Sequence, residues 1–320
     1  MVAIGYSLMT EQRSPVDIVA DAQLAEQAGF DFATISDHYH PWIEAQGHSG
    51  FCWSMLGAIS QVTSRLPVTT YVTAPIIRYH PAVIAQAAAT MATLMPERFR
   101  LGLGSGENLN EHVVGGGFPA NDVRQEILEE AVEIIRELWQ GDYVTYRGQH
   151  FDVERARVFD LPDRLPDIGI AAGGPQAAEL AASAGDFLIT TVPDPKLIQT
   201  YEKAAGPGHA IVGQTPVCWA QDEQGARKTA HKLQGWTVAG WKVQTELVDP
   251  ESFQEIADQT TEEQVAETVP SGPDLDQIVD AVKQYVDAGF TEIAITQVGP
   301  DQQGFCDIFH NELGPKLRKL

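Results

Sequence analysis

Hydrophobic residues along the chain follow two different periods in turn. Residues 32–36 and 292–296 are short runs rich in apolar and β-branched side chains, whereas residues 16–27 and 122–140 place apolar side chains three and four positions apart. The first pattern is typical of buried strands and the second of amphipathic helices. An alternation of the two predicts strands joined by helices in a parallel sheet.

A helix-to-strand joint built on glycine occurs three times. Gly29, Gly185 and Gly289 each follow a helix-like stretch and precede a short run of strand-forming residues. Glycine suits this place because the residue after the last turn of a helix often adopts a left-handed conformation. The repetition supports a chain of consecutive α and β units.

Eight strand-like runs are predicted, and most are followed by a helix-like stretch. The runs cover residues 3–9, 32–36, 68–73, 99–104, 168–172, 187–190, 211–219 and 292–298. The most distinct helices cover residues 16–27, 82–94 and 122–140. Eight such units predict an α/β fold of the (β/α)8 type, a TIM barrel, with residues 1–320 as a single domain. A doubly wound open sheet is the alternative.

Four segments interrupt the repeat and are expected to be insertions, near residues 38–51, 107–121, 142–167 and 234–273. Within the third, the alternation around Arg147-Gly148 predicts a β-hairpin. In a barrel, the loops that follow the carboxyl ends of the strands build the active site. The candidate chemistry is therefore expected in those loops.

The charge of the chain limits its partners. The 320 residues include 44 acidic and 21 basic side chains, which gives a formal net charge of −23. Such a chain repels phosphate backbones and anionic lipids, so neither nucleic acid nor a membrane is expected as a partner. An ordinary acidic enzyme and adaptation to a salt-rich cytoplasm both fit this composition. No apolar run approaches the roughly 18 residues of a membrane span and no secretion signal opens the chain, so a cytoplasmic location is expected.

The densest group of candidate side chains follows the second predicted strand, in Ser36-Asp37-His38-Tyr39-His40-Pro41-Trp42. A carboxylate, two imidazoles and an indole at a barrel mouth favour an acid–base or redox pocket with an aromatic wall. Two other interpretations stay open: side chains packed on the barrel rim, and a metal site at His38 and His40. The three cysteines are scattered and form no Cys-x-x-Cys pair, which excludes a disulfide framework and a cysteine zinc site.

Two glycine-rich runs follow other predicted strands. Residues 102–111 read Gly-Leu-Gly-Ser-Gly-Glu-Asn-Leu-Asn-Glu, in which the glycines allow close approach of a flat ring or a phosphate. Residues 171–176 read Ala-Ala-Gly-Gly-Pro-Gln, and the N–H groups that open the next helix can bind phosphate. The run Arg78-Tyr79-His80-Pro81 is interpreted as a turn before a helix.

These runs, in this order, resemble the bacterial-luciferase-like superfamily of flavin and deazaflavin enzymes. The similarity is closest to the branch that contains deazaflavin-dependent glucose-6-phosphate and secondary alcohol dehydrogenases. Besides residues 36–42, 104–111 and 171–175, it rests on residues 75–86 and on the closing Leu313-Gly314-Pro315-Lys316-Leu317, and it covers nearly the whole chain. The resemblance implies a luciferase-like TIM barrel that binds coenzyme F420, acts on an alcohol or sugar, and forms a homodimer.

By motif position, the resemblance also implies roles for individual residues. His38 would be the base or the hydrogen-bond anchor for a substrate hydroxyl, with Trp42 as the pocket wall. Glu107 would handle a proton of the cofactor ring, and Glu11 would be a further acid. The residues implied to contact the cofactor are Asp37, Tyr71, Val72, Ser105, Gly106, Asn110, Ala172, Gly173 and Gly174, with a cis peptide bond between Tyr71 and Val72. No metal is implied.

The chain departs from the sugar-phosphate members, which the resemblance credits with two lysines and an arginine around the phosphate. Here the corresponding strand-six loop offers only Lys196, and no basic residue lies between Lys242 and Lys283. That stretch carries carboxylates, which would repel a dianion. Glucose 6-phosphate is therefore disfavoured relative to a neutral alcohol, a free sugar or another carbonyl compound. The alternatives are an FMN-dependent monooxygenase, a non-catalytic deazaflavin-binding protein and a metal-dependent hydrolase.

Overall fold

Eight parallel strands close into a barrel in the computed structural model, which describes residues 2–320. The strands are β1 (Ala3–Leu8), β2 (Phe32–Ile35), β3 (Val68–Thr70), β4 (Phe99–Leu103), β7 (Ile168–Ala171), β8 (Phe187–Ile189), β9 (Ile211–Val217) and β10 (Glu292–Gln297). Around the barrel they follow the order β1-β10-β9-β8-β7-β4-β3-β2. Since β1 pairs with both β10 and β2, the sheet has no free edge. The barrel is confirmed, and the open doubly wound sheet is wrong.

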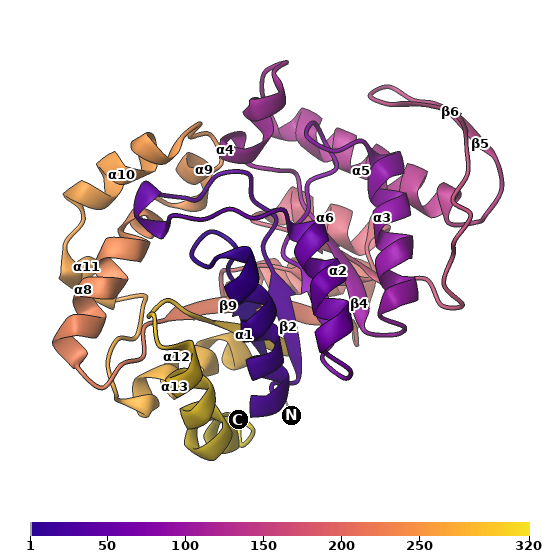
Figure 1. The fold of residues 1–320 in the computed structure, drawn as a ribbon. Coiled ribbons are helices and arrows are strands. Elements are labelled where there is room, and N and C mark those ends of the chain that lie inside the picture. Colours follow the sequence, from indigo (N-terminus) through magenta and orange to yellow (C-terminus); the bar gives the residue numbers. More distant parts are fainter. Residues whose placement is uncertain (1) are drawn as a thin grey trace.

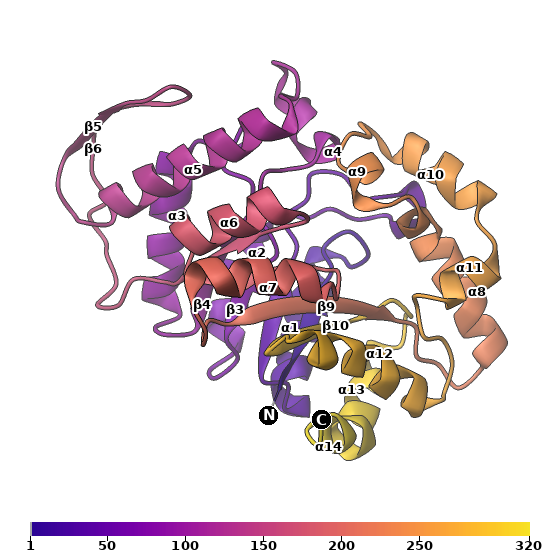
Figure 2. The ribbon, with the colours of Figure 1, turned by 180° about the vertical axis from the view of Figure 1, so that it is seen from behind.

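Helices cover the outside of the barrel (Figure 1, and from behind in Figure 2). The longer ones are α1 (Pro15–Ala28), α2 (Cys52–Val62), α3 (Pro81–Leu94), α5 (Asn121–Leu138), α6 (Pro175–Ala184), α7 (Pro195–Ala205), α8 (Glu223–Gln234) and α12 (Leu275–Ala288). The chain closes with α13 (Gln302–Ile308), a π-helical turn (Phe309–Leu313) and α14 (Gly314–Leu317). None of the helices within residues 2–320 combines the length and apolarity that a membrane span requires.

Local sequence accounts for the ends of several helices. The Ser14 hydroxyl caps α1 by accepting a hydrogen bond from the Asp17 N–H, and Pro15 opens the helix. Gly29 and Gly289 adopt left-handed conformations after α1 and α12, as predicted. The prediction was wrong for Gly185: this residue is extended, with φ −94°, so α6 ends without a left-handed residue. A strand nevertheless follows each of the three glycines, namely β2, β8 and β10.

The four interruptions contain short elements. Residues 38–51 hold η1 (Glu44–Gln46), and residues 107–121 hold α4 (Asn108–Glu111) and η2 (His112–Val114). The predicted hairpin is formed by β5 (Val144–Arg147) and β6 (Asp152–Ala156), which pair antiparallel and project from the body of the molecule (Figure 1). The last segment holds η3 (Gly235–Val238), α9 (Trp241–Gln244), α10 (Pro250–Gln259) and α11 (Glu262–Ala266).

Predicted strand ends differ from the observed ones mainly on the carboxyl side. The third strand ends at Thr70 instead of residue 73, and the strand that starts at Ile211 ends at Val217 instead of residue 219. Beyond these points the backbone leaves the ladder to form the mouth of the barrel, although Thr73 still bridges to Leu103. The residues that follow the strands are therefore free to present side chains at the mouth.

Candidate active site

The mouth of the barrel brings one histidine between two carboxylates. Glu11 follows β1, His38 follows β2 and Glu107 follows β4. Nε2 of His38 lies 3.5 Å from Oε1 of Glu11 and 3.7 Å from Oε2 of Glu107. His38 and Glu11 are buried, whereas the Glu107 side chain is 16% exposed. An imidazole between two carboxylates in a water-poor site is suited to exchange protons with a bound substrate.

Hydroxyl groups orient the first of these carboxylates. The hydroxyls of Thr10 and Ser36 both donate to Oε2 of Glu11. Oε1 is thereby left to face His38. Both hydroxyls come from positions next to strand ends, so the barrel itself fixes the direction of the carboxylate.

Asn110 connects the histidine loop to the Glu107 loop. Its buried side chain accepts hydrogen bonds from the backbone N–H groups of Tyr39 (2.9 Å) and His40 (3.3 Å) through Oδ1. Its Nδ2 lies 2.8 Å from Oε2 of Glu107 and 3.2 Å from Nδ1 of His38. The resemblance implies a cofactor contact for Asn110, but in the structure the amide is engaged by protein groups on both sides.

Aromatic rings wall off one side of His38. The Trp42 ring centre lies 4.7 Å from that of His38. Trp42 also stacks on Trp236, with 4.3 Å between the ring centres and an angle of 11° between the rings. Phe253 meets Trp42 edge-on at 5.2 Å. Trp42 was predicted as the wall, but Trp236 and Phe253 were missed. Both lie in the 234–273 insertion, and the only sequence signal was the presence of large aromatic residues in an otherwise polar segment.

A second charged group lies at the mouth beside the first, around Asp37. Oδ2 of Asp37 accepts from the Thr73 hydroxyl at 2.7 Å, and Oδ1 accepts from Arg78 Nη2 at 3.2 Å and the Tyr79 hydroxyl at 3.0 Å. Arg78 also donates to the Asp37 carbonyl. The turn at residues 78–81 was predicted correctly, since Pro81 opens α3. The prediction missed that Arg78 and Tyr79 reach Asp37.

Glu111 completes this charged group. Its Oε2 accepts from the backbone N–H of Arg78 at 2.8 Å, and its Oε1 lies 3.6 Å from Arg78 Nε. The side chain is fully buried, and this burial raises the pKa of Glu111 to about 7 against the opposing effect of Arg78. Glu111 was part of the recognised run but was not predicted as a site residue.

The glycine run after β4 packs tightly against the segment that follows β3. Gly104 has no room for a side chain, because a Cβ there would lie 2.6 Å from Cγ2 of Val72. Gly106 has φ +74°, and a Cβ would lie 2.9 Å from the Glu111 side chain. The Tyr71–Val72 peptide bond is cis, as the resemblance implied. Tyr71, Val72 and Ser105 are half-buried, so they border the mouth next to this run.

The second glycine run, Ala172, Gly173 and Gly174, opens α6 on the far side of the mouth. Trp241 of the 234–273 insertion lies against Gly173, where a Cβ would come within 2.9 Å of the indole. Gly174 precedes the helix and has open space where a side chain would be. The N–H groups at the start of α6 are thus accessible to an anion beneath an aromatic cover.

The Glu107 loop is clamped to the 234–273 insertion. The backbone N–H of Asn108 donates to the Thr245 carbonyl at 2.9 Å, and its side chain donates to the Glu246 carbonyl at 3.1 Å. The buried Arg124 of α5 lies 3.2 Å from the Glu246 carboxylate. The insertion thus fixes the position of Glu107 as well as supplying the aromatic wall.

The two histidines of the Asp-His-Tyr-His run point to different places. His38 faces the two carboxylates, whereas the His40 ring lies 5.9 Å from the His112 ring. Burial and the neighbouring His112 lower the pKa of His40. Within residues 2–320, no three His, Cys, Asp or Glu side chains are arranged to hold a metal ion. The His38–His40 metal site is therefore wrong as a geometric arrangement.

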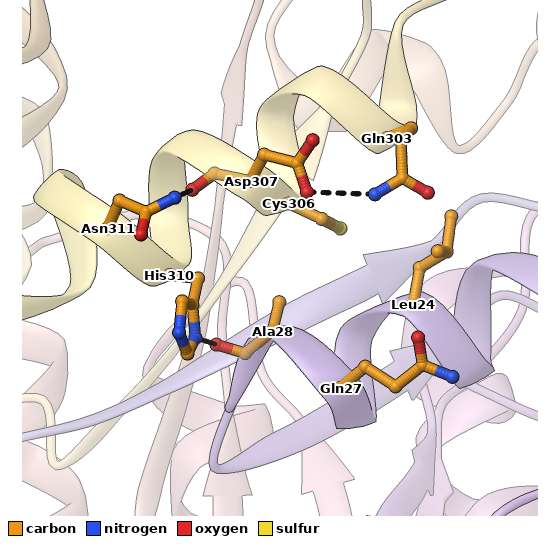
Figure 3. Close-up of a pocket in the computed structure, with 8 residues that line it drawn as sticks. All are labelled: Leu24, Gln27, Ala28, Gln303, Cys306, Asp307, His310 and Asn311. Atoms are coloured by element: carbon orange, nitrogen blue, oxygen red, sulfur yellow. Dashed lines mark hydrogen bonds between the residues drawn. The ribbon is translucent and has the colours of Figure 1, made fainter.

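Two hollows on the molecule lie away from His38. One, of about 180 Å³, lies between α1 and α13 and is lined by Leu24, Gln27, Cys306 and His310 among others (Figure 3). The other, of about 290 Å³, reaches Met9, Gln46 and Gly299 at the edge of the mouth. Neither is lined by His38 or Glu107, so the convergence of side chains, not the size of a hollow, locates the candidate site.

The sequence of the chain matches a known family across most of its length. The family model described as luciferase-like monooxygenase matches residues 2–292. The chain belongs to this family. Family membership agrees with the barrel and with the order of the motifs at its mouth.

Several members of the family are similar over their whole length. The F420-dependent glucose-6-phosphate dehydrogenase of Mycolicibacterium gilvum is 36% identical over 99% of this chain and 98% of its own, and that of Mycobacterium tuberculosis strain H37Rv is 35% identical over the same shares. A solved F420-dependent secondary alcohol dehydrogenase in complex with an F420-acetone adduct superposes with a TM-score of 0.92 at 29% identity, covering 99% of both chains. A coenzyme F420-dependent tetrahydromethanopterin reductase from Methanopyrus kandleri shares the fold, with a TM-score of 0.78 at 20% identity over 99% of both chains.

Proposed function

We propose that this protein is a coenzyme F420-dependent oxidoreductase that interconverts an alcohol and its carbonyl compound. The observation that carries the proposal is the cluster of His38, Glu11 and Glu107 at the mouth of a luciferase-like barrel. The full-length similarity to F420-dependent dehydrogenases supports the choice of cofactor and of reaction. When bound, the deazaflavin accepts or gives a hydride at ring carbon 5.

The residues at the mouth fit such a cofactor. Tyr71, Val72 and Ser105 form a half-buried border beside the glycine run after β4, which suits the edge of a flat ring. Gly174 leaves open space at the start of α6, which suits a phosphate. This anion site relies on backbone N–H groups, so it can work in a chain of strongly negative net charge.

Three side chains share the hydrogen bonding and proton transfer that the reaction requires. His38 lies where it can hold the oxygen of an alcohol through Nε2, the nitrogen that also faces Glu11. Glu107, in the loop that follows β4, is placed for a proton of the cofactor ring. Trp42, supported by Trp236, excludes water from the same space.

We further propose a neutral alcohol as substrate in preference to a sugar phosphate. The wall beside His38 is made of Trp42, Trp236 and Phe253, which favour an apolar carbon skeleton. Lys196 is exposed at the start of α7, and one exposed cation holds a dianion weakly. The insertion that closes this side has no basic residue between Lys242 and Lys283.

We also propose that the protein is located in the cytoplasm and that it forms a homodimer. Both the dimer and the location are proposed from the resemblance to F420-dependent dehydrogenases. The excess of 44 acidic over 21 basic side chains supports solubility at high salt. Sedimentation at low and molar salt measures the state of assembly.

The experiment that tests the function is a titration of the purified protein with coenzyme F420, followed by a panel of alcohols and glucose 6-phosphate. We expect binding, and loss of the 420 nm absorbance when a neutral alcohol is added. Loss with glucose 6-phosphate alone would contradict the substrate class. Binding of flavin mononucleotide in place of F420 would favour a monooxygenase, and binding without turnover on any substrate would favour a non-catalytic binding protein.

A further inference from the structure

The amide of Asn110 has only one orientation that satisfies its surroundings. On one side it meets the backbone N–H groups of Tyr39 and His40, at 2.9 and 3.3 Å. Backbone N–H groups can only donate, so the oxygen of the amide must lie there. The NH₂ group must therefore point to the opposite side.

On that side the NH₂ group meets two atoms. Nδ2 lies 2.8 Å from Oε2 of Glu107 and 3.2 Å from Nδ1 of His38. An amide nitrogen has two N–H donors and accepts nothing, so each of these atoms must be an acceptor. Asn110 therefore favours a His38 ring whose Nδ1 carries no proton.

The other nitrogen of the ring has the opposite surroundings. Nε2 of His38 faces the carboxylate oxygens of Glu11 at 3.5 Å and Glu107 at 3.7 Å, and both favour a proton on Nε2. The His40 carbonyl, 3.2 Å from Nδ1, favours a proton there instead. It is a single neutral acceptor, and it is opposed by the Asn110 donor at Nδ1 and by the electrostatic attraction of two carboxylates at Nε2.

We infer that Asn110 is a positioning residue that keeps the neutral His38 ring in the tautomer with its proton on Nε2. The consequence for catalysis rests on the proposed function. His38 then meets the substrate oxygen as a hydrogen-bond donor. During oxidation of the alcohol, the hydroxyl proton passes to Oε1 of Glu11, the carbinol hydrogen leaves with its electron pair for the deazaflavin, and the carbon–oxygen bond becomes double.

The tautomer is measured directly by nitrogen NMR on the full chain labelled with [15N]histidine, without any cofactor. The measurement is made at about pH 8, above the ordinary pKa of histidine. The spectrum of His38→Gln identifies the His38 signals among the nine histidines. We expect a protonated Nε2 and an unprotonated Nδ1. A proton on Nδ1, or on both nitrogens, overturns the inference.

The role of Asn110 is tested by Asn110→Asp, which keeps the size of the side chain and replaces the NH₂ donor by an acceptor. We expect the proton of His38 to move to Nδ1, and turnover with F420 to fall by about 10²-fold or more. The matched control is Asn311→Asp, the same change at an exposed amide that donates to the Asp307 carbonyl and not to His38. We expect its His38 signals to match those of the wild type.

Two results would contradict this role. A proton that stays on Nε2 in Asn110→Asp shows that the carboxylates alone set the tautomer. A loss of F420 affinity with an unchanged tautomer, measured by fluorescence titration, shows that Asn110 is a cofactor ligand. If the protein binds no F420 at all, the proposed function fails, while the NMR result on the unliganded chain still decides the tautomer.

Discussion

Carboxylates form two groups at the barrel mouth, an Arg78 side and a His38 side, and the two groups differ in their partners. Asp37 and Glu111 lie against Arg78, with hydroxyl and backbone donors completing their contacts. Glu11 and Glu107 lie against His38, which is their ion-pair partner within residues 2–320. One side thus pairs its carboxylates with a permanent cation, and the other with an imidazole ring that can donate a hydrogen bond.

The difference separates structural from reactive charge. Arginine stays protonated throughout the working range, so the Arg78 side is a fixed arrangement that joins β2, β3 and the Glu107 loop. Either ring nitrogen of a neutral imidazole can donate or accept a hydrogen bond, so the His38 side can take part in a reaction. Changes on the first side are therefore expected to alter stability, and changes on the second to alter turnover.

The largest effect is expected for His38→Ala. Removing a positioned acid–base or anchoring group should lower kcat by about 10²- to 10⁴-fold. The free energy of unfolding should change much less, because the ring packs against Trp42 at the rim and not in the barrel core. Steady-state kinetics at 420 nm and urea unfolding measure the two quantities. Unchanged turnover would place the chemistry elsewhere.

The second effect is the loss of stability expected for Arg78→Met. The change leaves Asp37 and Glu111 buried without their cation, and breaking such a pair costs about 3–5 kcal/mol. Urea unfolding gives the value. The matched control is Arg136→Met. Both side chains of the Arg136–Asp186 pair are about two-fifths exposed, so the loss of this pair should cost less than about 1 kcal/mol. Equal losses in the two variants would remove the distinction between the sides.

The third effect concerns pH and Glu111. Because burial raises its pKa to about 7, the folded protein keeps a proton there that the unfolded chain releases above its ordinary pKa of about 4.5. The stability that this group contributes is therefore complete below about pH 4.5 and is lost as the pH rises through 7. The shift corresponds to about 3 kcal/mol.

Glu111→Gln should remove this pH dependence. The free energy of unfolding of the wild type should fall relative to that of the variant between about pH 5 and pH 8. Urea unfolding at several pH values in one buffer system measures the difference. Parallel curves for the two proteins would mean that Arg78 keeps Glu111 ionised in the folded state.

The barrel was predictable because its signals are local. Each strand is a short apolar run and each helix has its own period, and Gly29 and Gly289 mark joints that depend on neighbours in sequence alone. The strand ends were less predictable. Residues 71–73 have strand-like side chains, but the ladder stops at Thr70, where the backbone turns into the mouth.

The site was predictable where its residues lie within recognised runs or, like Glu11, directly after a predicted strand. His38, Trp42 and Glu107 belong to such runs. Trp236 and Phe253 do not, because their approach to Trp42 depends on how the insertion packs over the barrel. Arg78 shows the same limit, since its position before a helix explains the backbone but says nothing about Asp37, which comes from another strand.

The pairing of β1 with β10 has a consequence for the growing chain. The first strand leaves the ribosome long before its partner at Glu292–Gln297 has been made. At synthesis rates of about 5–20 residues per second, one edge of β1 stays unpaired for tens of seconds, exposed to other nascent chains. The seam of the barrel is therefore the part of the molecule that depends most on chaperone protection during translation.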